Sequence, residues 1–300
     1  MLDRESLYDA ELLAALCRSP LPGRPTPFPV RGIHRSRLRG SSLEFSEHTE
    51  YMPGDELRSL DWRVYAKSDR YFVRRYEDER LAKTLIVVDA SSSMSYGGTS
   101  GTLTGSKYQL AARIAVSISS ALLRQGDAVG LCVTGAEPFF IPPRGGMAQL
   151  DSLLDVLAST VPAGSAGKDT LLAYCAERLP KPSALVWVGD LLDEGDETLS
   201  SFVTLKARGI YPRIVHLLHP DETGLPFENS TRFEDLESAS FLVADPAALR
   251  KAYAEELRAF VRELSGRAHE AGLPYVFLRD IEEARRFLPA ALKRQDSRAL

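Results

Sequence analysis

Residues 84–95 read TLIVVDASSSMS, an apolar run that ends in one carboxylate and a cluster of hydroxyls. A continuous apolar run of this kind is typical of a strand that is covered on both faces of a sheet. Residues 107–125, KYQLAARIAVSISSALLRQ, follow after a loop and carry apolar residues at helical spacing. The stretch therefore predicts a strand, a loop and a helix, with polar side chains at the carboxyl end of the strand.

The same alternation of strands and helices continues to the end of the chain. The further strands are expected at residues 128–135, 138–143, 183–190, 210–220 and 273–279, and the further helices at residues 147–160, 170–179, 197–209, 246–272 and beyond 279. Parallel neighbouring strands need crossover connections, which the intervening helices supply. We predict an α/β fold with a doubly wound, mostly parallel sheet and helices on both faces.

Three regions are expected along the chain. Residues 1–30 comprise one amphipathic helix over residues 1–20 and an extended, proline-rich linker. Residues 31–80 contain turn signals such as Met52-Pro53-Gly54-Asp55 and predict a small β-rich region of short strands and hairpins. Residues 81–295 form the α/β domain, in which residues 227–246 interrupt the last crossover as a hairpin or loop insertion.

The composition excludes some classes of protein and partner. The chain has 300 residues, of which 44% are hydrophobic, and can bury a sizeable core; its formal net charge of -4 gives no overall attraction to nucleic acid or anionic membranes. The basic run at residues 31–39 has no aromatic residues between its charges, so we expect no nucleic-acid partner. The N-terminus is acidic where a signal peptide is basic, and the apolar runs are too short to span a membrane. We expect a cytoplasmic protein without membrane insertion.

Oxygen-bearing side chains gather at the predicted strand ends and at the start of one helix. They are Asp89, Ser91 and Ser93 in the spacing D-x-S-x-S, Asp169 and Thr170, and Asp190. Ligands of open α/β sheets collect at the carboxyl ends of the strands. Hydroxyls and carboxylates without histidine or thiolate favour a hard divalent cation, Mg²⁺ or Mn²⁺. The alternative interpretation is that Asp89 and the serines only cap the following helix.

Three enzyme motifs fail at this loop. A haloacid-dehalogenase-type phosphatase needs a second carboxylate two residues after the first, where this chain has Ser91. The glycines at 164 and 167 do not have the spacing of a phosphate-binding loop, and the G-x-S-x-G elbow of serine hydrolases is absent. We expect a protein that is not an enzyme. A metal-dependent phosphoester hydrolase and a scaffold with a vestigial metal site are the alternatives.

The strand-end motif, the later threonine and the second strand-end aspartate resemble the von Willebrand factor A domain and its metal-ion-dependent adhesion site. Residues 39–79, RGSSLEFSEHTEYMPGDELRSLDWRVYAKSDRYFVRRYEDE, resemble the signature of the bacterial family called domain of unknown function 58. Its elements are G-x-x-x-E-F, Y-x-P-G-D, R-x-x-D-W and R-x-x-E-x-E, followed by D-A-S-S-S-M. The resemblance runs from about residue 31 to about residue 290, and it is to the short branch of the family, without transmembrane helices.

The resemblance implies a von Willebrand factor A-like fold and a role for each motif residue. Ser91 and Ser93 would ligate the metal directly, Asp89 and Asp190 would bind it mainly through water, and Thr170 would supply a third hydroxyl. Relatives place the threonine directly after G-G or G-K, whereas this chain reads Gly167-Lys168-Asp169-Thr170. Three outcomes are therefore open: Thr170 still reaches the metal, Asp169 replaces it, or the site is degraded.

The resemblance also implies a partner, an AAA+ ATPase of the MoxR type or the client protein that it remodels. The expected function is a non-enzymatic interaction module, in which Mg²⁺ leaves one coordination position for an Asp or Glu of the partner. A second candidate surface comprises Asp55, Arg58, Asp61, Trp62 and Arg63. These residues are interpreted either as a partner surface or as a structural network of arginine and aspartate.

Overall fold

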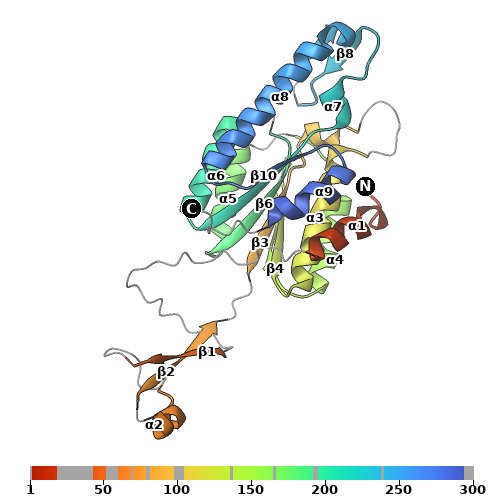
Figure 1. Ribbon diagram of the computed structural model, residues 1–300. Coiled ribbons are helices and arrows are strands. Elements are labelled where there is room, and N and C mark those ends of the chain that lie inside the picture. Colours follow the sequence, from red (N-terminus) through yellow and green to blue (C-terminus); the bar gives the residue numbers. More distant parts are fainter. Residues whose placement is uncertain are drawn as a thin grey trace. The chain divides into compact units, whose positions relative to one another are not determined.

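The computed structural model describes residues 2–18, 43–51, 60–68, 70–78, 82–97, 105–135, 138–164, 167–191, 195–237 and 240–293. The chain divides into two compact units, one of residues 1–25 and 82–300 and the other of residues 26–81. Most of the strands and helices belong to the larger unit (Figure 1).

Within its described residues, the smaller unit contains one antiparallel pair of strands and one helix. Strand β1 (Leu43–Glu50) pairs with β2 (Phe72–Asp78), with an irregularity in register between Phe45 and Glu47. Helix α2 (Trp62–Ser68) lies between them in sequence. The predicted tight turn at residues 52–55 lies outside the described residues.

A six-stranded sheet forms the centre of the larger unit, in the order β10-β7-β6-β3-β4-β5. Its strands are β3 (Lys83–Val88), β4 (Ala128–Val133), β5 (Phe139–Arg144), β6 (Ser183–Gly189), β7 (Ile210–Leu217) and β10 (Tyr275–Leu278). All neighbouring pairs are parallel except β4 and β5. The predicted mostly parallel sheet is therefore confirmed, with β5 as an antiparallel edge strand.

The strand order places the topological switch point beside β3. From β3 the chain adds β4 and β5 on one side, and then β6, β7 and β10 on the other. Crevices at such switch points, at the carboxyl ends of the strands, are where open α/β sheets bind ligands. Asp89 follows β3 and Asp190 follows β6, so the topology brings both predicted carboxylates to this point.

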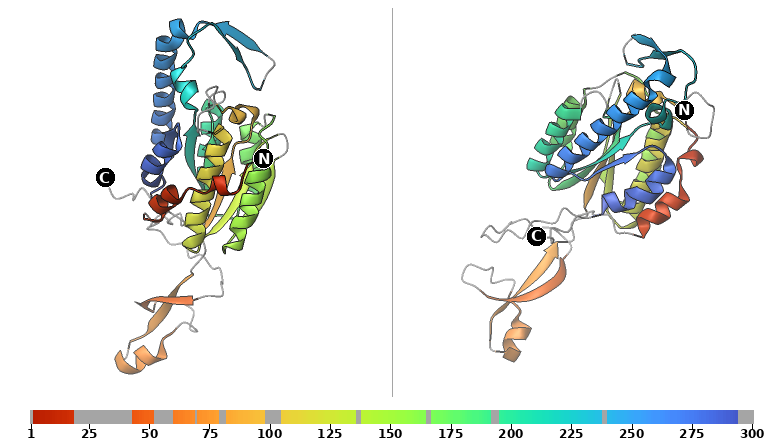
Figure 2. Two further views of the ribbon diagram at one scale, coloured as in Figure 1. Left: turned by 90° about the vertical axis from the view of Figure 1, so that its right-hand side faces the viewer. Right: turned by 45° about the horizontal axis from the view of Figure 1, so that its top comes forward.

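Helices cover both faces of the sheet, as expected for a doubly wound fold (Figures 1 and 2). One layer comprises α1 (Ala10–Cys17), α3 (Lys107–Arg124), α4 (Ala148–Ser159) and α9 (Ile281–Leu292). The other comprises α5 (Lys168–Arg178), α6 (Gly195–Ala207) and α8 (Pro246–Glu270). The short helix α7 (Pro220–Gly224) follows β7 in sequence.

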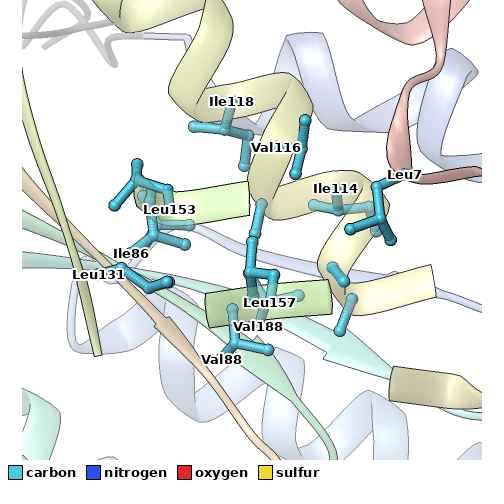
Figure 3. Packing of buried hydrophobic residues seen from close by; sticks show 14 of the residues in the cluster. Leu7, Ile86, Val88, Ile114, Val116, Ile118, Leu131, Leu153, Leu157 and Val188 are labelled. Carbon is cyan, nitrogen blue, oxygen red and sulfur yellow. The ribbon is translucent and has the colours of Figure 1, made fainter. Parts of the chain in front are cut away.

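The two layers explain why β3 is a continuous apolar run. Ile86 and Val88 pack into the cluster under α1, α3, α4 and α9, shown in part in Figure 3. Leu85 and Val87 point the other way, into the cluster with α5, α6 and α8. Because successive side chains of a strand point to opposite faces, a strand buried on both faces needs apolar residues at every position.

The N-terminal segment differs from the prediction of one helix over residues 1–20. It forms a 3-10 turn, η1 (Glu5–Leu7), and then α1, and the break falls at Asp9, whose side chain accepts a hydrogen bond from the Leu12 amide. Asp9 acts as an N-cap, which begins a new helix by satisfying a free amide. Leu7, Leu12 and Leu16 are fully buried in the core of the larger unit.

The predicted insertion at residues 227–246 is a hairpin. Strand β8 (Thr231–Glu234) pairs antiparallel with β9 (Phe241–Ala244), just before α8. Arg250 of α8 donates hydrogen bonds to the carbonyls of Leu225 and Phe227 and so holds the entry to the hairpin.

Candidate metal and partner-binding site

Asp89 is the first polar residue beyond β3, and it is 2% exposed. Its Oδ1 accepts hydrogen bonds from the Ser91 amide at 2.9 Å and from the Thr134 hydroxyl at 3.0 Å. Its Oδ2 is buried and has no hydrogen-bond partner among the described residues. A buried carboxylate oxygen without a donor is costly, so this atom marks a position where a cation would be favourable.

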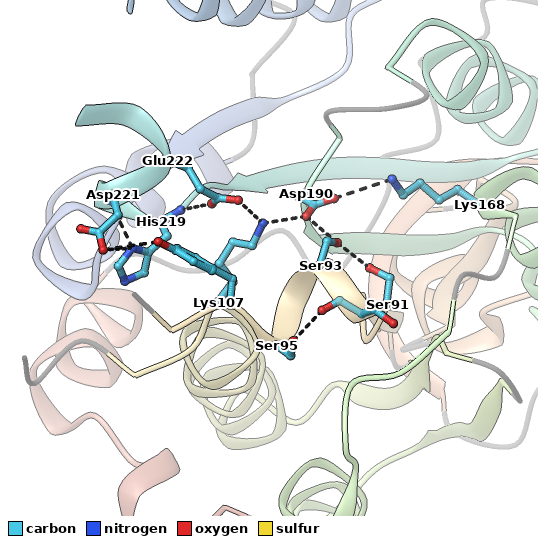
Figure 4. Close-up of polar contacts among 11 residues, drawn as sticks. Ser91, Ser93, Ser95, Lys107, Lys168, Asp190, His219, Asp221 and Glu222 are labelled. Atoms are coloured by element: carbon cyan, nitrogen blue, oxygen red, sulfur yellow. Dashed lines mark hydrogen bonds and ion pairs between the residues drawn. The ribbon is translucent and has the colours of Figure 1, made fainter. Parts of the chain in front are cut away.

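The two motif serines lie next to Asp89 on the loop and on the 3-10 helix η3 (Ser92–Ser95). The Oγ atoms of Ser91 and Ser93 are 3.0 Å apart, and the Ser93 hydroxyl donates to Oδ2 of Asp190 at 2.9 Å (Figure 4). Four of the predicted site residues, Asp89, Ser91, Ser93 and Asp190, therefore gather at the ends of two adjacent parallel strands.

Gly189 allows this close approach. A Cβ atom at position 189 would lie 2.3 Å from the Cβ of Asp89, far inside van der Waals contact. The last residue of β6 therefore has to lack a side chain for the loop after β3 to pass beside it.

Lys107 completes the site, and motif analysis of the sequence missed it. It is the first residue of α3 and is 3% exposed. Its Nζ donates to Oδ2 of Asp190 at 2.9 Å and to Oε1 of Glu222 at 2.7 Å (Figure 4). The signal in the sequence is its position after the N-cap Ser106, because the positive end of a helix disfavours a cation unless carboxylates lie nearby.

Glu222 belongs to α7, which was also missed: the strand expected over residues 210–220 ends at the first residue of this helix. The side chain of His219 accepts from the Asp221 amide, while Oε2 of Glu222 accepts from the His219 amide at 2.6 Å. These two contacts form a reciprocal capping box at the start of α7. Glu222 therefore both begins this helix and binds Lys107.

The helix that was expected to supply the third hydroxyl does not bring Thr170 into this network. Thr170 is exposed, and within the described residues no hydrogen bond joins it to the other predicted ligands. The side chain of Asp169 lies outside the described part. Lys168, the first residue of α5, reaches the site instead, with its Nζ 3.7 Å from Oδ1 of Asp190.

The buried charges shift one another's pKa values in opposite directions. Burial, together with the negative charge of Asp190, raises the pKa of Asp89. Burial also acts to raise the pKa of Asp190, but the Lys107 ammonium, with Lys168 and the Ser93 hydroxyl, holds it below its usual range. Burial acts to lower the pKa of Lys107, and the carboxylates of Asp190 and Glu222 outweigh it. Lys107 and Asp190 are therefore a charged pair, whereas Asp89 holds its proton more readily than an exposed aspartate.

Sequence comparison places the chain in a family. The family model described as protein of unknown function DUF58 matches residues 47–262. This chain belongs to the DUF58 family. It is similar to the uncharacterized protein Rv1480 of Mycobacterium tuberculosis (strain H37Rv), with 27% identity over 256 residues that cover 83% of this chain and 78% of the relative. The resemblance inferred from the sequence signature is confirmed.

The solved structures to which the chain is similar include BatB from Bacteroides thetaiotaomicron, at 16% identity and a TM-score of 0.46, covering 70% of this chain and 96% of that one. They also include the SpRpn10 VWA domain, at 14% identity and a TM-score of 0.33, covering 46% of this chain and 76% of that one. We assign the von Willebrand factor A-like fold of this DUF58 chain from its own sheet order, strand directions and strand-end motif.

The donor set of the DUF58 site fits a hard cation. Its oxygens are the hydroxyls of Ser91 and Ser93 and the carboxylates of Asp89 and Asp190, and Oδ2 of Asp89 has no donor among the described residues. The described ranges contain no group of three or more His, Cys, Asp or Glu side chains that could hold a metal. A metal at this position would therefore depend on the serine hydroxyls.

The second candidate surface lies in the smaller unit of the DUF58 chain. Asp55 and Arg58 lie outside the described residues. Asp61 is buried, and its Oδ1 accepts from the Arg63 amide at 3.0 Å, at the start of α2. Trp62 is 61% exposed and contacts the Tyr65 ring edge-on. Asp61 therefore has a structural role, while Trp62 offers an exposed aromatic surface.

Among the helices of the described residues, none combines the length and apolar composition needed to cross a membrane. The cytoplasmic location expected from the N-terminal sequence stays a prediction.

Proposed function

We propose that this protein is a non-enzymatic interaction module that binds a carboxylate-bearing protein partner through a divalent cation, Mg²⁺ or Mn²⁺. The cation would be held by Ser91 and Ser93 directly and by Asp89 and Asp190 mainly through water. The observation that carries the proposal is the convergence of these four side chains at the switch point, with Oδ2 of Asp89 buried and without a donor among the described residues. A bound ion would supply an open coordination position for an Asp or Glu side chain.

The charges around the site favour such a partner only when the ion is present. With Asp89 ionised, the site holds the carboxylates of Asp89, Asp190 and Glu222 and the ammonium groups of Lys107 and Lys168. These charges sum to about −1, which repels an acidic ligand; one divalent cation brings the sum to about +1, which attracts it. Dependence on the metal and preference for a carboxylate therefore have one physical origin.

The contacts at the site favour binding over hydrolysis. The Ser93 hydroxyl donates to Asp190, but Lys107 holds the pKa of Asp190 low, which makes this carboxylate a weak general base. His216 bonds the Tyr275 hydroxyl through Nδ1, and burial lowers the pKa of His216 to about 3. His219 caps α7. Both histidines thus have structural roles, and the described site contains no strong base beside a nucleophile.

We propose an AAA+ ATPase of the MoxR type, or the client that it remodels, as the partner, in protein maturation or remodelling. This part of the proposal is supported by membership of the DUF58 family and by the motif resemblance. The test is capture from native lysate on the immobilised full chain in Mg²⁺ and in EDTA. We expect a MoxR-type ATPase or a bound client to be retained in Mg²⁺ and released by the chelator.

The second arm of the test is the variant Ser93→Ala, which removes one proposed ligand from a partly buried position without adding bulk. This variant should fail to retain the partner in Mg²⁺, as the wild type does in EDTA. Retention that is indifferent to both EDTA and Ser93→Ala would contradict a metal-dependent mechanism. Robust Mg²⁺-dependent turnover of generic phosphoester substrates, abolished by Asp89→Asn, would instead favour the hydrolase.

A further inference from the structure

Lys107 is a buried cation at a position where a cation is intrinsically unfavourable. It is the first residue of an 18-residue helix and is 3% exposed. The helix dipole places partial positive charge at this end, and burial of an ammonium group is strongly unfavourable before its partners are counted. The carboxylates of Asp190 and Glu222, at 2.9 and 2.7 Å, offset this cost. An apolar residue would fill the position without any of these requirements.

The contacts of Lys107 divide the two strand-end aspartates into different roles. Oδ2 of Asp190 already accepts from both Lys107 and Ser93, and Oδ1 lies 3.7 Å from Lys168. Oδ2 of Asp89, by contrast, has no donor within the described residues. Lysine therefore neutralises Asp190, whereas no lysine of the described residues bonds Oδ2 of Asp89.

We propose that Lys107 is a tethered cation that competes with the divalent ion for Asp190 and thereby sets the metal affinity of the site. In the metal-free protein Lys107 neutralises Asp190. When the ion binds, Lys107 gives up Oδ2 of Asp190 and keeps its ion pair with Glu222 on α7. This proposal deepens the proposed function and rests on it, because it takes the divalent ion to bind beside Asp89 and Asp190.

Glu222 is the group that makes the exchange feasible. It is on a separate helix from every proposed metal ligand, and its Oε2 is fixed by the His219 amide at 2.6 Å. Its Oε1 therefore stays in place to hold the Lys107 ammonium after Asp190 is released. Without such a second carboxylate the displaced ammonium would be buried and unpaired, which is strongly unfavourable.

The test is titration of Mn²⁺ into the full-length wild type and the Lys107→Met variant by calorimetry, with thermal unfolding in Mg²⁺ as a second readout. Removal of a positive charge a few ångströms from the metal should tighten Mn²⁺ binding by about tenfold or more. The variant should also be less stable than the wild type without metal, and gain more in melting temperature from Mg²⁺.

Lys206→Met is the matched control. Like Lys107, Lys206 has two acceptors, here the carbonyls of Ala271 and Gly272 at 2.7 and 3.0 Å, but it is half-buried, and these carbonyls belong to the α8–β10 connection and not to the site. Its loss should lower stability and leave the Mn²⁺ affinity of the wild type unchanged.

The outcomes separate this proposal from the proposed function. If Lys107→Met folds and binds Mn²⁺ as weakly as the wild type or more weakly, Lys107 does not compete and the proposal is overturned, while the metal site stands. If neither protein binds Mn²⁺, both proposals fail. Should Lys107→Met not fold, Glu222→Gln gives the second arm: Lys107 then depends on Asp190 alone, and Mn²⁺ affinity should fall several-fold. Equal or tighter binding by Glu222→Gln would overturn the proposal.

Discussion

Asp9 ties the N-terminal segment to the α/β core through charge, and its substitution has a calculable cost. It is 4% exposed, its Oδ2 lies 2.7 Å from Arg113 on α3 and 2.8 Å from Arg285 on α9, and its Oδ1 caps α1 through the Leu12 amide. Removal of one member of a buried ion pair costs about 3–5 kcal/mol. Because each arginine side chain is 26% exposed and can be partly hydrated, we expect Asp9→Asn to cost about 2–3 kcal/mol.

Asp9→Ala separates the charge from the cap. The asparagine side chain can still accept from the Leu12 amide, whereas alanine cannot. We therefore expect Asp9→Ala to be about 1 kcal/mol less stable than Asp9→Asn, which is the usual value of an N-cap.

The assay is equilibrium unfolding in urea, followed by the fluorescence of Trp187, which is fully buried in the larger unit. The Trp62→Phe background removes the other tryptophan, which is 61% exposed and belongs to the smaller unit. Stability differences of less than about 0.5 kcal/mol among the three proteins would refute the reasoning, since that is the scatter of ordinary surface substitutions.

The pH dependence of the free energy of unfolding provides an independent test of the ion pairs of Asp9. Burial acts to raise the pKa of Asp9, but its hydrogen bonds and the charges of Arg285 and Arg113 hold it below its usual value of 3.8. A lowered pKa contributes stability that is present above the unfolded value and lost as pH falls through the folded value. The stability advantage of the wild type over Asp9→Asn should therefore be full at pH 7 and vanish at pH values below the folded pKa.

Three further predictions follow from the site and the core. Gly189→Ala should lower stability by about 1–3 kcal/mol through overpacking against Asp89 and should abolish any stabilisation by Mg²⁺. Thermal unfolding with and without the ion would measure both effects. Unchanged stability would contradict the close approach of position 189 to Asp89. Ser93→Ala should lower the Mn²⁺ affinity while changing the free energy of unfolding by only about 1 kcal/mol. Phe202 on α6 is fully buried against Trp187, so Phe202→Ala should cost about 3–5 kcal/mol, whereas Val203→Ala, at a 44% exposed position, should stay within about 0.5 kcal/mol. Similar urea midpoints for both variants would contradict the packing described.

The sheet could be predicted because the buried positions of its strands are apolar in the sequence. A strand such as residues 83–88, buried on both faces, has to be apolar throughout, and the helices between strands fix the parallel direction. The strand-end positions of Asp89 and Asp190 follow from the same pattern. The break at Asp9 was missed because one capping contact decides it within an otherwise continuous helical pattern.

The cationic half of the site could not be predicted from motif spacing. Lys107, Lys168 and Glu222 come from three separate helices, and only the fold brings the two lysines to Asp190 and Glu222 to Lys107. The position of Lys107 directly after the N-cap Ser106 is a weak signal in the sequence, but it does not say which carboxylates pair with the lysine. The hydroxyl and carboxylate ligands could therefore be predicted from the sequence, whereas the charged groups that shift the pKa values of these carboxylates could not.

The most direct test of metal-dependent partner binding is the affinity of the purified full chain for the purified MoxR-type ATPase of the same organism, measured by biolayer interferometry in Mg²⁺ and after addition of EDTA. We expect binding in Mg²⁺ that EDTA abolishes, that Mn²⁺ restores, and that Ser93→Ala lacks under all three conditions. Binding of equal strength in EDTA and by Ser93→Ala would show that the strand-end site does not govern association.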